Sequence, residues 1–171
     1  MDPRNFKIED VTLNYARLDR TVSPFGSPQF EFQIATTDQA KVAMLETNHI
    51  MFRRNPDGTL KTNPDGEFFA SLKRKAVKAD GSDNGPVRVV NADTTPFPAD
   101  KMGRIGNGSR GNVIVFQYPW EQAGRKGIAS SLTAVQVTEF KEFVPTGGVD
   151  FEPVGGMSPT PAETQDPVSM F

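Results

Sequence analysis

The sequence predicts an all-β protein, a small antiparallel barrel or sandwich with one short helix. Stretches rich in β-branched and aromatic residues recur along its 171 residues, and clusters of Gly, Pro, Asn and Asp separate them at short intervals. Only residues 37–48 have the periodicity of a helix. The chain contains no strand–helix–strand alternation of the kind that builds a parallel sheet, which favours an antiparallel layout.

The longest β-rich stretch, residues 103–143, predicts a β-hairpin. Residues 112–120 and 128–140 are rich in Val, Ile, Thr and aromatic residues and contain no glycine, so each suits a pleated, half-buried surface. Residues 121–127 between them are polar and include two glycines, which can supply the positive φ angles of a turn. We therefore expect two long strands joined by a turn over 121–127.

Two strands and a helix are predicted in the first 48 residues. Residues 6–18 alternate loosely, with a phase shift near Glu9 that indicates a β-bulge. A second strand is indicated by the strict alternation of Phe30, Phe32 and Ile34. The helix over 37–48 would begin at Thr37 or Asp38 as its N-cap. Its expected apolar face consists of Ala40, Ala43, Met44 and Thr47, with Leu45 beside it.

The middle of the chain combines turns with shorter strands. Residues 50–54 have β character, and two copies of Asn-Pro-Asp-Gly, at 55–58 and 63–66, carry a type I turn signature. The spacing and closing Glu of a calcium-binding EF-hand loop are missing, so we expect plain turns. Residues 87–90 predict a short buried strand, and residues 94–102 predict a crossing segment without regular structure.

Residues 67–77 predict a strand with two different faces. Phe68, Ala70 and Leu72 would point to the core, because side chains alternate along a strand. The opposite face would be basic, with one aromatic ring, and Arg74 would lie at the end of the strand. This face consists of Phe69, Ser71, Lys73 and Lys75.

Composition and charge divide the chain into a folded domain, residues 1–144, and a flexible tail, residues 145–171. The chain is 36% hydrophobic, enough for one core. The tail has five prolines, four glycines, four acidic residues and no Lys or Arg, which leaves 19 basic against 17 acidic residues in the preceding part. Such a segment buries too little apolar surface to offset its ordering entropy.

Several classes of protein are disfavoured by what the sequence lacks. It has neither an apolar run of about 18 residues nor a charged-then-apolar start, so we expect a cytosolic protein without a membrane span or secretory signal. Without cysteine, the chain forms no disulfide and no thiolate metal site. Its single histidine, His49, cannot build a histidine cluster, and we expect it to be an ordinary residue at the surface or at a helix end.

Known catalytic and nucleotide-binding motifs give little support for an enzyme. Residues 106–111 match G-x-G-x-x-G, but they precede a strand and lack the Gly-Lys-Ser/Thr ending of a P-loop. We interpret them as a tight strand-opening loop that can approach a nucleic-acid backbone. No HExxH, GxSxG or Cys–His pair occurs, so we expect no catalytic residues, no cofactor and no metal. The enzyme alternative is a metal-dependent nuclease with ligands from Asp57, Asp65, Asp80 and Asp93.

Basic and aromatic residues recur together, which is typical of proteins that bind single-stranded nucleic acid. Exposed bases stack on aromatic rings at about 1 to 3 kcal/mol each, while Lys and Arg neutralise phosphates. The opposing interpretation places Phe52, Phe116 and Trp120 in the core and the cations in solvent. The predicted DNA-binding residues are Arg53, Arg54, Phe69, Lys73, Arg74, Lys75, Arg88, Arg110, Tyr118, Trp120, Arg125 and Lys126.

Three segments together resemble the single-stranded DNA-binding proteins of tailed bacteriophages. They are Pro-Val-Arg-Val-Val-Asn-Ala at 86–92, Ile-Gly-Asn-Gly-Ser at 105–109, and Leu-Thr-Ala-Val-Gln-Val at 132–137. The resemblance covers residues 86–143 well and extends to the N-terminal half through the order of strands. It implies an OB-fold barrel that coats single-stranded DNA during phage replication and recombination in the cytoplasm of the infected bacterium, without enzymatic activity.

The same resemblance implies an acidic C-terminal tail that contacts phage replication proteins such as the polymerase and the helicase or primase. Here the chain ends in Asp-Pro-Val-Ser-Met-Phe, and Glu163, Asp166 and Phe171 are the expected contact residues. The tail departs from the family pattern because its four carboxylates are widely spread. The sequence leaves monomer and homodimer open. A phage structural β-sandwich, assembled through residues 55–66, is the main alternative function.

Overall fold

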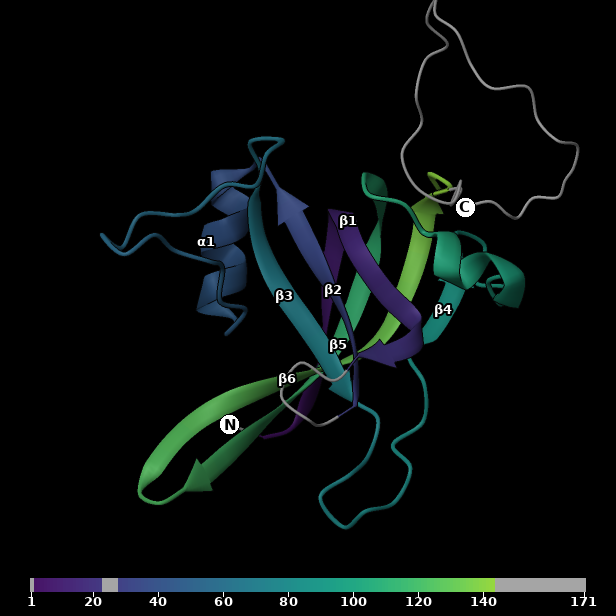
Figure 1. The fold of residues 1–171 in the computed structure, drawn as a ribbon. Coiled ribbons are helices and arrows are strands. Elements are labelled where there is room, and N and C mark those ends of the chain that lie inside the picture. The colour runs from purple at the N-terminus through teal and green to yellow at the C-terminus, as the bar shows by residue number, and fades with distance from the viewer. Residues whose placement is uncertain (1, 23–27, 144–171) are drawn as a thin grey trace, which may run out of the picture.

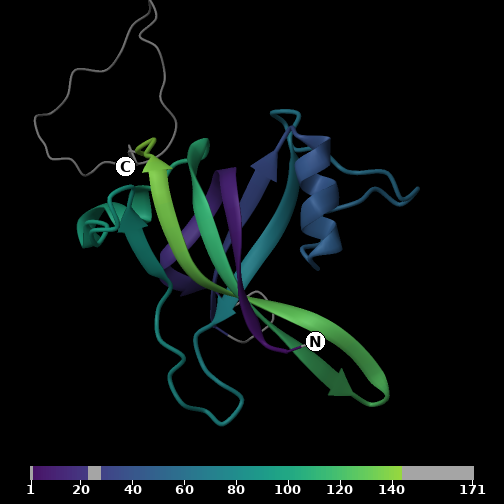
Figure 2. The same cartoon turned by 180° about the vertical axis from the view of Figure 1, so that it is seen from behind.

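The computed structural model describes residues 2–22 and 28–143 (Figures 1 and 2). The predicted tail and its contact residues Glu163, Asp166 and Phe171 lie outside the described residues. Among those residues, no helix has the length and apolar character needed to cross a membrane. In chain order, the elements are β1 (Arg4–Val22), β2 (Gln29–Thr36), α1 (Gln39–Thr47), β3 (Phe68–Lys75), β4 (Arg88–Asn91), the 3₁₀ helix η1 (Ala99–Arg104), β5 (Ser109–Gln122) and β6 (Arg125–Glu139).

Five of these strands close into a barrel. The strands hydrogen-bond in the order β3-β2-β1-β5-β6-β4, and a further pairing between β3 and β6 joins the two sides. This closing contact is parallel and pairs Lys73 with Ser131, whereas the other barrel pairs are antiparallel. The short strand β4 adds to β6 outside the barrel. The predicted small barrel of OB-fold type is confirmed, because closure excludes an open sandwich.

The long strand β1 contributes to both halves of the barrel because two bulges bend it. Its register against β5 shifts between Ile8 and Val11, and Asp10 there has a φ of 51°. A second irregularity, against β2, lies between Asn14 and Arg17. Each bulge bends the strand and increases its twist, which lets one strand pair with β5 and then with β2. The bulge predicted near Glu9 is therefore confirmed.

The barrel interior is filled by aliphatic residues of every barrel strand and by Phe32. Fully buried examples are Ile8, Leu13, Ile34, Val113, Val115 and Leu132. One polar side chain in this interior, Gln117, is also fully buried. Its amide nitrogen donates to the Asn48 carbonyl at 2.7 Å and to Ser130 Oγ at 3.0 Å, and its oxygen accepts from Arg4 Nε at 3.0 Å. Because its hydrogen bonds are made, Gln117 links the end of α1 to the barrel without leaving a buried polar group unsatisfied.

Helix α1 begins as predicted but buries a different face. Asp38 is the N-cap, and its carboxylate accepts hydrogen bonds from the backbone N–H groups of Ala40 and Lys41. The buried residues are Val42 and Leu45, so the predicted face is wrong except for Leu45. In a helix of 9 residues this i, i+3 pair of branched side chains is enough to cover the barrel contact. The predicted residues that are exposed instead are Ala40, Ala43, Met44 and Thr47.

The hairpin of β5 and β6 has a shorter turn than predicted. Its ladder continues to Gln122 opposite Arg125, so the turn has two residues and not the seven of 121–127. Ala123 and Gly124 have φ angles of 53° and 78°, the signs that a type I′ turn requires. Figures 1 and 2 show that this end of the hairpin projects well beyond the barrel.

Two of the predicted connecting segments differ from expectation, whereas the two Asn-Pro-Asp-Gly turns agree with it. Residues 50–54 form no strand and make a single bridge, from Arg54 to Leu60. The 94–102 segment, expected to be irregular, includes the start of η1. Both Asn-Pro-Asp-Gly turns are confirmed, since Gly58 N–H donates to the Asn55 carbonyl and Gly66 N–H to the Asn63 carbonyl, each at 2.9 Å.

Candidate nucleic-acid interface

Three aromatic side chains form a row on the outer face of β5. Phe116, Tyr118 and Trp120 occupy alternate positions, which point to one side of a strand, and they are 39%, 38% and 40% exposed. The rings of Phe116 and Tyr118 are stacked, with centroids 5.9 Å apart and planes at 28°. Large aromatic side chains that lie side by side and open to solvent provide π-faces to which a planar ligand can stack.

The basic face of β3 lies next to this aromatic row. Ala70 and Leu72 are buried while Ser71, Lys73 and Lys75 are exposed, so the predicted division of the strand is confirmed. The pairing of Lys73 with Ser131 brings the end of β3 against β6. Because β6 also pairs with the aromatic part of β5, lysines and rings from distant parts of the sequence meet on one surface.

Together these elements line a hollow of about 900 Å³, which we call the basic–aromatic groove. Among the described residues that line it, the cations are three lysines and Arg74, against one carboxylate, Glu121. The loop after β3 and the projecting end of the hairpin leave the same end of the barrel (Figures 1 and 2). The lining residues are Asn5, Lys73, Arg74, Lys75, Val77, Lys78, Ala79, Asn84, Phe116, Tyr118, Trp120, Glu121, Gln122, Ala129, Ser130, Ser131 and Thr133.

A second hollow, of about 550 Å³, adjoins the basic–aromatic groove. The two hollows share Lys73 and Ser130 as lining residues. The second hollow is more mixed in charge, because Arg53 and Lys73 face Glu31. Its lining residues are Tyr15, Gln29, Glu31, Phe32, Gln33, His49, Ile50, Met51, Arg53, Ser71, Leu72, Lys73, Ile128 and Ser130.

Arg74 borders the groove, but its guanidinium is bound to the protein backbone. Nε donates to the Gly85 carbonyl at 3.0 Å, Nη1 to the Leu132 carbonyl at 3.3 Å, and Nη2 to the Asn84 carbonyl. These bonds hold the loop after β3 against β6. Arg74 therefore shapes the groove and adds positive charge to it, while most of its donors are already used.

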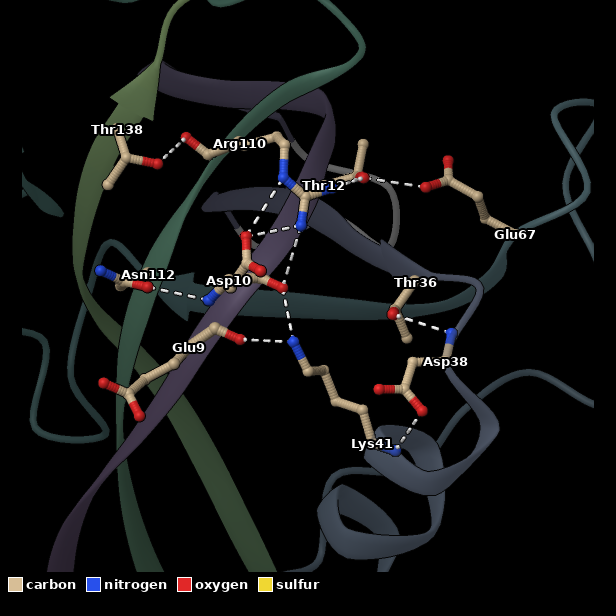
Figure 3. A network of polar contacts seen from close by, with 10 residues as sticks. All are labelled: Glu9, Asp10, Thr12, Thr36, Asp38, Lys41, Glu67, Arg110, Asn112 and Thr138. Atoms are coloured by element: carbon tan, nitrogen blue, oxygen red, sulfur yellow. Dashed lines mark hydrogen bonds and ion pairs between the residues drawn. The ribbon is translucent and has the colours of Figure 1, made fainter.

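Arg110, another predicted DNA-binding residue, lies apart from the groove. Arg110 and Trp120 are ten residues apart on β5, about 33 Å of strand. Nη2 of Arg110 bonds Asp10 Oδ1 at 2.6 Å, and Nη1 donates to Thr12 Oγ1 at 3.1 Å (Figure 3). The hydrogen bond and the charge of Arg110 lower the pKa of the Asp10 carboxyl. The same bulge also receives Lys41, whose Nζ donates to the Asp10 carbonyl at 2.7 Å.

The remaining predicted cations occupy several separate places. Arg54 is bound to Glu46 at 2.5 Å and to the Gly58 carbonyl at 2.9 Å, outside both hollows. Arg88 is exposed on β4, and it lines neither hollow. Arg125 is exposed at the tip of the hairpin beside Lys126. Half-buried Phe69, on the outward side of β3, likewise lines neither hollow.

The glycine-rich loop at 105–109 is a structural clasp. Gly106 N–H donates to the Lys141 carbonyl at 2.7 Å, Gly108 N–H to Asn14 Oδ1 at 3.0 Å, and Ser109 N–H to the Gly106 carbonyl at 3.1 Å. These three donors are satisfied inside the protein, so they are not available to a phosphate. The expectation that this loop approaches a nucleic-acid backbone receives no support from the geometry. The loop instead ties β1 and β5 to the chain after β6.

Phe116, Lys78 and Asn5 are among the groove-lining residues that sequence reasoning did not predict. Phe116 had a usable signal, because it shares the strand parity of Tyr118 and Trp120 and must point the same way. Lys78 lies in a loop, where no periodicity indicates direction. Asn5 lies opposite Phe116 in the ladder between β1 and β5, a pairing that cannot be read from local sequence.

The four aspartates of the nuclease alternative are not gathered at one place. Asp57, Asp80 and Asp93 each accept hydrogen bonds from the side chain and backbone of a Ser or Thr two residues later, which lowers the pKa of each carboxyl. These are three copies of one turn in three separate loops. Within residues 2–22 and 28–143, no three His, Cys, Asp or Glu side chains are arranged to hold a metal ion.

Comparison with known proteins identifies the fold. Neither a protein-family model nor a curated protein sequence matches the chain. A solved structure of the single-stranded DNA-binding protein from bacteriophage Enc34 in complex with ssDNA matches with a TM-score of 0.55 and 15% identity over 81% of this chain and 88% of that chain. The single-stranded DNA-binding protein gp2.5 of bacteriophage T7 matches with a TM-score of 0.53 and 15% identity, over 87% and 98%.

The chain has the fold of phage single-stranded DNA-binding proteins. A further structure of the single-stranded DNA-binding protein from bacteriophage Enc34 matches with a TM-score of 0.54 and 16% identity over 85% of this chain and 87% of that chain. These matches extend across both halves of the barrel, whereas the sequence resemblance is concentrated in residues 86–143. The shared fold therefore includes β1, β2 and β3, where sequence reasoning had only the order of strands.

Proposed function

We propose that the protein binds single-stranded DNA without sequence preference, in the basic–aromatic groove. The observation that carries this proposal is the row of Phe116, Tyr118 and Trp120 beside Lys73 and Lys75. Among residues 2–22 and 28–143, neither lysine has a hydrogen bond or ion pair to its ammonium group, in contrast to Arg110. The solved structure of an Enc34 protein with ssDNA on the same fold supports the proposal.

The chemistry of the groove suits a flexible, unpaired strand. Each exposed ring can stack one base, at about 1 to 3 kcal/mol, and each lysine can neutralise one phosphate. Every base has a π-face, so stacking does not distinguish sequences. Alternate positions on a strand are about 6.8 Å apart, which matches bases spread along an extended backbone better than bases stacked in a duplex. Binding of this kind requires no catalytic group.

We further propose that this binding serves phage DNA replication and recombination in the bacterial host, with residues 145–171 recruiting replication proteins. The support is the sequence resemblance, the shared fold, and the acidic residues Glu163 and Asp166 that precede the aromatic Phe171. Deleting residues 145–171 should leave folding and DNA binding intact, with affinity raised only modestly, and should abolish capture of the phage polymerase or helicase. Loss of folding in the truncated protein would contradict the assignment of these residues as a tail.

A gel-shift experiment tests the binding proposal against its alternatives. The protein is mixed with labelled oligo-dT, a mixed-sequence single strand and a duplex of equal length, with and without Mg²⁺. We expect both single strands to be retarded intact and the duplex to remain free. Magnesium-dependent degradation would instead indicate a nuclease. Absence of binding together with stable oligomers in solution would favour the structural-protein alternative.

A further inference from the structure

The residue opposite Trp120 in the hairpin ladder is Gly127. A Cβ atom at Gly127 would lie 2.7 Å from Nε1 of the indole and 2.8 Å from both Cε2 and Cζ2. These distances are shorter than any normal contact, so the edge of the indole occupies the space that a side chain at position 127 would need. The φ angle of Gly127 lies outside the left-handed region. Glycine is therefore required here by the close approach of the ring and not by the backbone conformation.

This contact occurs on the part of the hairpin that projects beyond the barrel. Trp120 lies on the projecting end of the hairpin, between the pairs Pro119–Ile128 and Glu121–Lys126. Its ring is 40% exposed and forms part of the groove wall. An aromatic side chain held in its binding orientation loses less conformational entropy when a ligand stacks on it. The bare backbone of Gly127 is the surface that can hold the ring there.

We infer that Gly127 is a positioning residue for DNA binding, which fixes the indole of Trp120 in the wall of the basic–aromatic groove. The inference rests on the proposed function. A methyl group at position 127 would displace the indole by about 1 Å, since carbon atoms prefer separations of about 3.5 to 4.0 Å. Because Trp120 is an exposed side chain, the ring can move without disrupting the fold. The displaced ring would then no longer be aligned with Tyr118 and Phe116.

A purely structural role for the same contact makes a different prediction. Aromatic rings commonly cover glycines on neighbouring strands and thereby stabilise a hairpin. In that case, Gly127→Ala would change the stability of the protein and leave its affinity for DNA unchanged. A positioning role changes the affinity, and only while Trp120 is present. The two roles are therefore separated by a double-mutant cycle.

The test measures the affinity of Gly127→Ala, Trp120→Ala and the double variant for fluorescein-labelled oligo-dT of about 30 nucleotides by anisotropy. We expect binding to weaken about five-fold in Gly127→Ala and about ten-fold or more in Trp120→Ala. The double variant should bind no more weakly than Trp120→Ala. The emission maximum of Trp120, the single tryptophan of the chain, should shift in Gly127→Ala.

A matched control is Gly103→Ala. Its Cβ would likewise meet a side chain, Asp19 Oδ2 at 2.7 Å, but outside the groove. The affinity of Gly103→Ala for oligo-dT should equal that of the wild type. The inference is overturned if Gly127→Ala binds like the wild type, or if it weakens binding equally in the Trp120→Ala background. Failure of the wild type itself to bind overturns the proposed function and the inference with it, and this outcome is visible in the wild-type titration alone.

Discussion

Basic residues lie near glycines and aromatic rings at both ends of the β5–β6 hairpin, but their side chains are used in opposite ways. At one end, Arg110 is bound to Asp10 and Thr12, and the glycine-rich loop donates its N–H groups to the protein backbone. At the other end, Lys73 and Lys75 extend into a groove beside Tyr118 and Trp120. A basic residue near glycines and aromatics is therefore not enough to indicate a DNA site. What matters is whether the hydrogen-bond donors of the basic side chain remain available to a ligand.

Gly106 and Gly127 show the same difference between the two ends of the hairpin at atomic scale. A Cβ at Gly106 would lie 2.7 Å from the Lys141 carbonyl oxygen, and a Cβ at Gly127 would lie 2.7 Å from the Trp120 indole nitrogen. The first neighbour is backbone that is fixed by the barrel, whereas the second is an exposed side chain that can move. Glycine thus serves stability at the clasp end, where Gly106 lies, whereas at the groove end we propose that Gly127 positions a ligand-binding ring.

Removing the cations of the groove end should give the largest effect on binding. Each phosphate contact to a single strand contributes about 0.7 to the salt slope, so Lys73→Ala with Lys75→Ala should lower the slope by about 1.4. If the two proteins bind equally at about 1 M salt, this slope difference corresponds to about 65-fold weaker binding of the variant at about 0.05 M. Fluorescence titration at several salt concentrations measures both quantities. Lys61→Ala, exposed but outside both hollows, is the control and should bind as the wild type does.

The next largest effect is expected from replacing Phe116. This substitution tests whether the ring binds DNA or belongs to the core. Phe116→Ala should weaken binding of oligo-dT about ten-fold, the loss of one stacked base, with little change in the midpoint of thermal unfolding. Phe140 is similarly exposed, at 37%, but packs on Phe97 outside the groove. Phe140→Ala should therefore lower stability and leave the affinity unchanged. If Phe116→Ala instead lowered stability and left the affinity unchanged, Phe116 would be a core residue.

At the clasp end, Gly106→Ala should destabilise the protein and spare DNA binding. The new methyl group would meet a backbone carbonyl that cannot move aside, and overpacking of this kind costs about 1 to 3 kcal/mol. Chemical denaturation measures the loss. The affinity of the folded variant for oligo-dT should equal that of the wild type. A variant that remains stable but loses DNA binding would mean that this loop belongs to the binding site.

The smallest effect is expected at Arg110. The ion pair with Asp10 is exposed, so Arg110→Ala should cost at most about 1 kcal/mol near neutral pH and should not alter the salt slope of DNA binding. Because the folded-state pKa of Asp10 is lowered, the pair stabilises the protein above the ordinary aspartate pKa and loses this effect as the pH falls through the folded value. The stabilities of wild type and variant should therefore begin to converge as the pH falls below about 4, and should meet only below the lowered pKa of Asp10.

The local pattern of the sequence predicted the strands and their faces well. Alternation along β3 correctly separated Ala70 and Leu72 from Lys73 and Lys75, because side-chain direction in a strand depends only on parity. The same rule would have placed Phe116 beside Tyr118. The helix face and the hairpin turn were less predictable. The packing partner of α1 is not local, and the turn uses Ala123 with a positive φ that alanine rarely adopts.

The assignments that the sequence could not make are those that depend on long-range partners. The local sequence does not distinguish the roles of Arg74 and Arg110 from that of Lys73, since all three are simply basic residues. Their guanidinium groups are bound by Leu132 and Asp10, which lie 58 and 100 positions away along the chain. The contact between Trp120 and Gly127 was also hidden, because it depends on a ladder register fixed by the two-residue turn. Only the folded chain shows which donors remain for a ligand.

The most direct test of the account uses the fluorescence of Trp120, the single tryptophan of the chain. The protein is titrated with oligo-dT of about 30 nucleotides at low and high salt, with a duplex of equal length as control. We predict that the single strand quenches the emission, that added salt weakens this binding, and that the duplex has no comparable effect. An unchanged emission and no binding of the single strand at low salt would contradict the account.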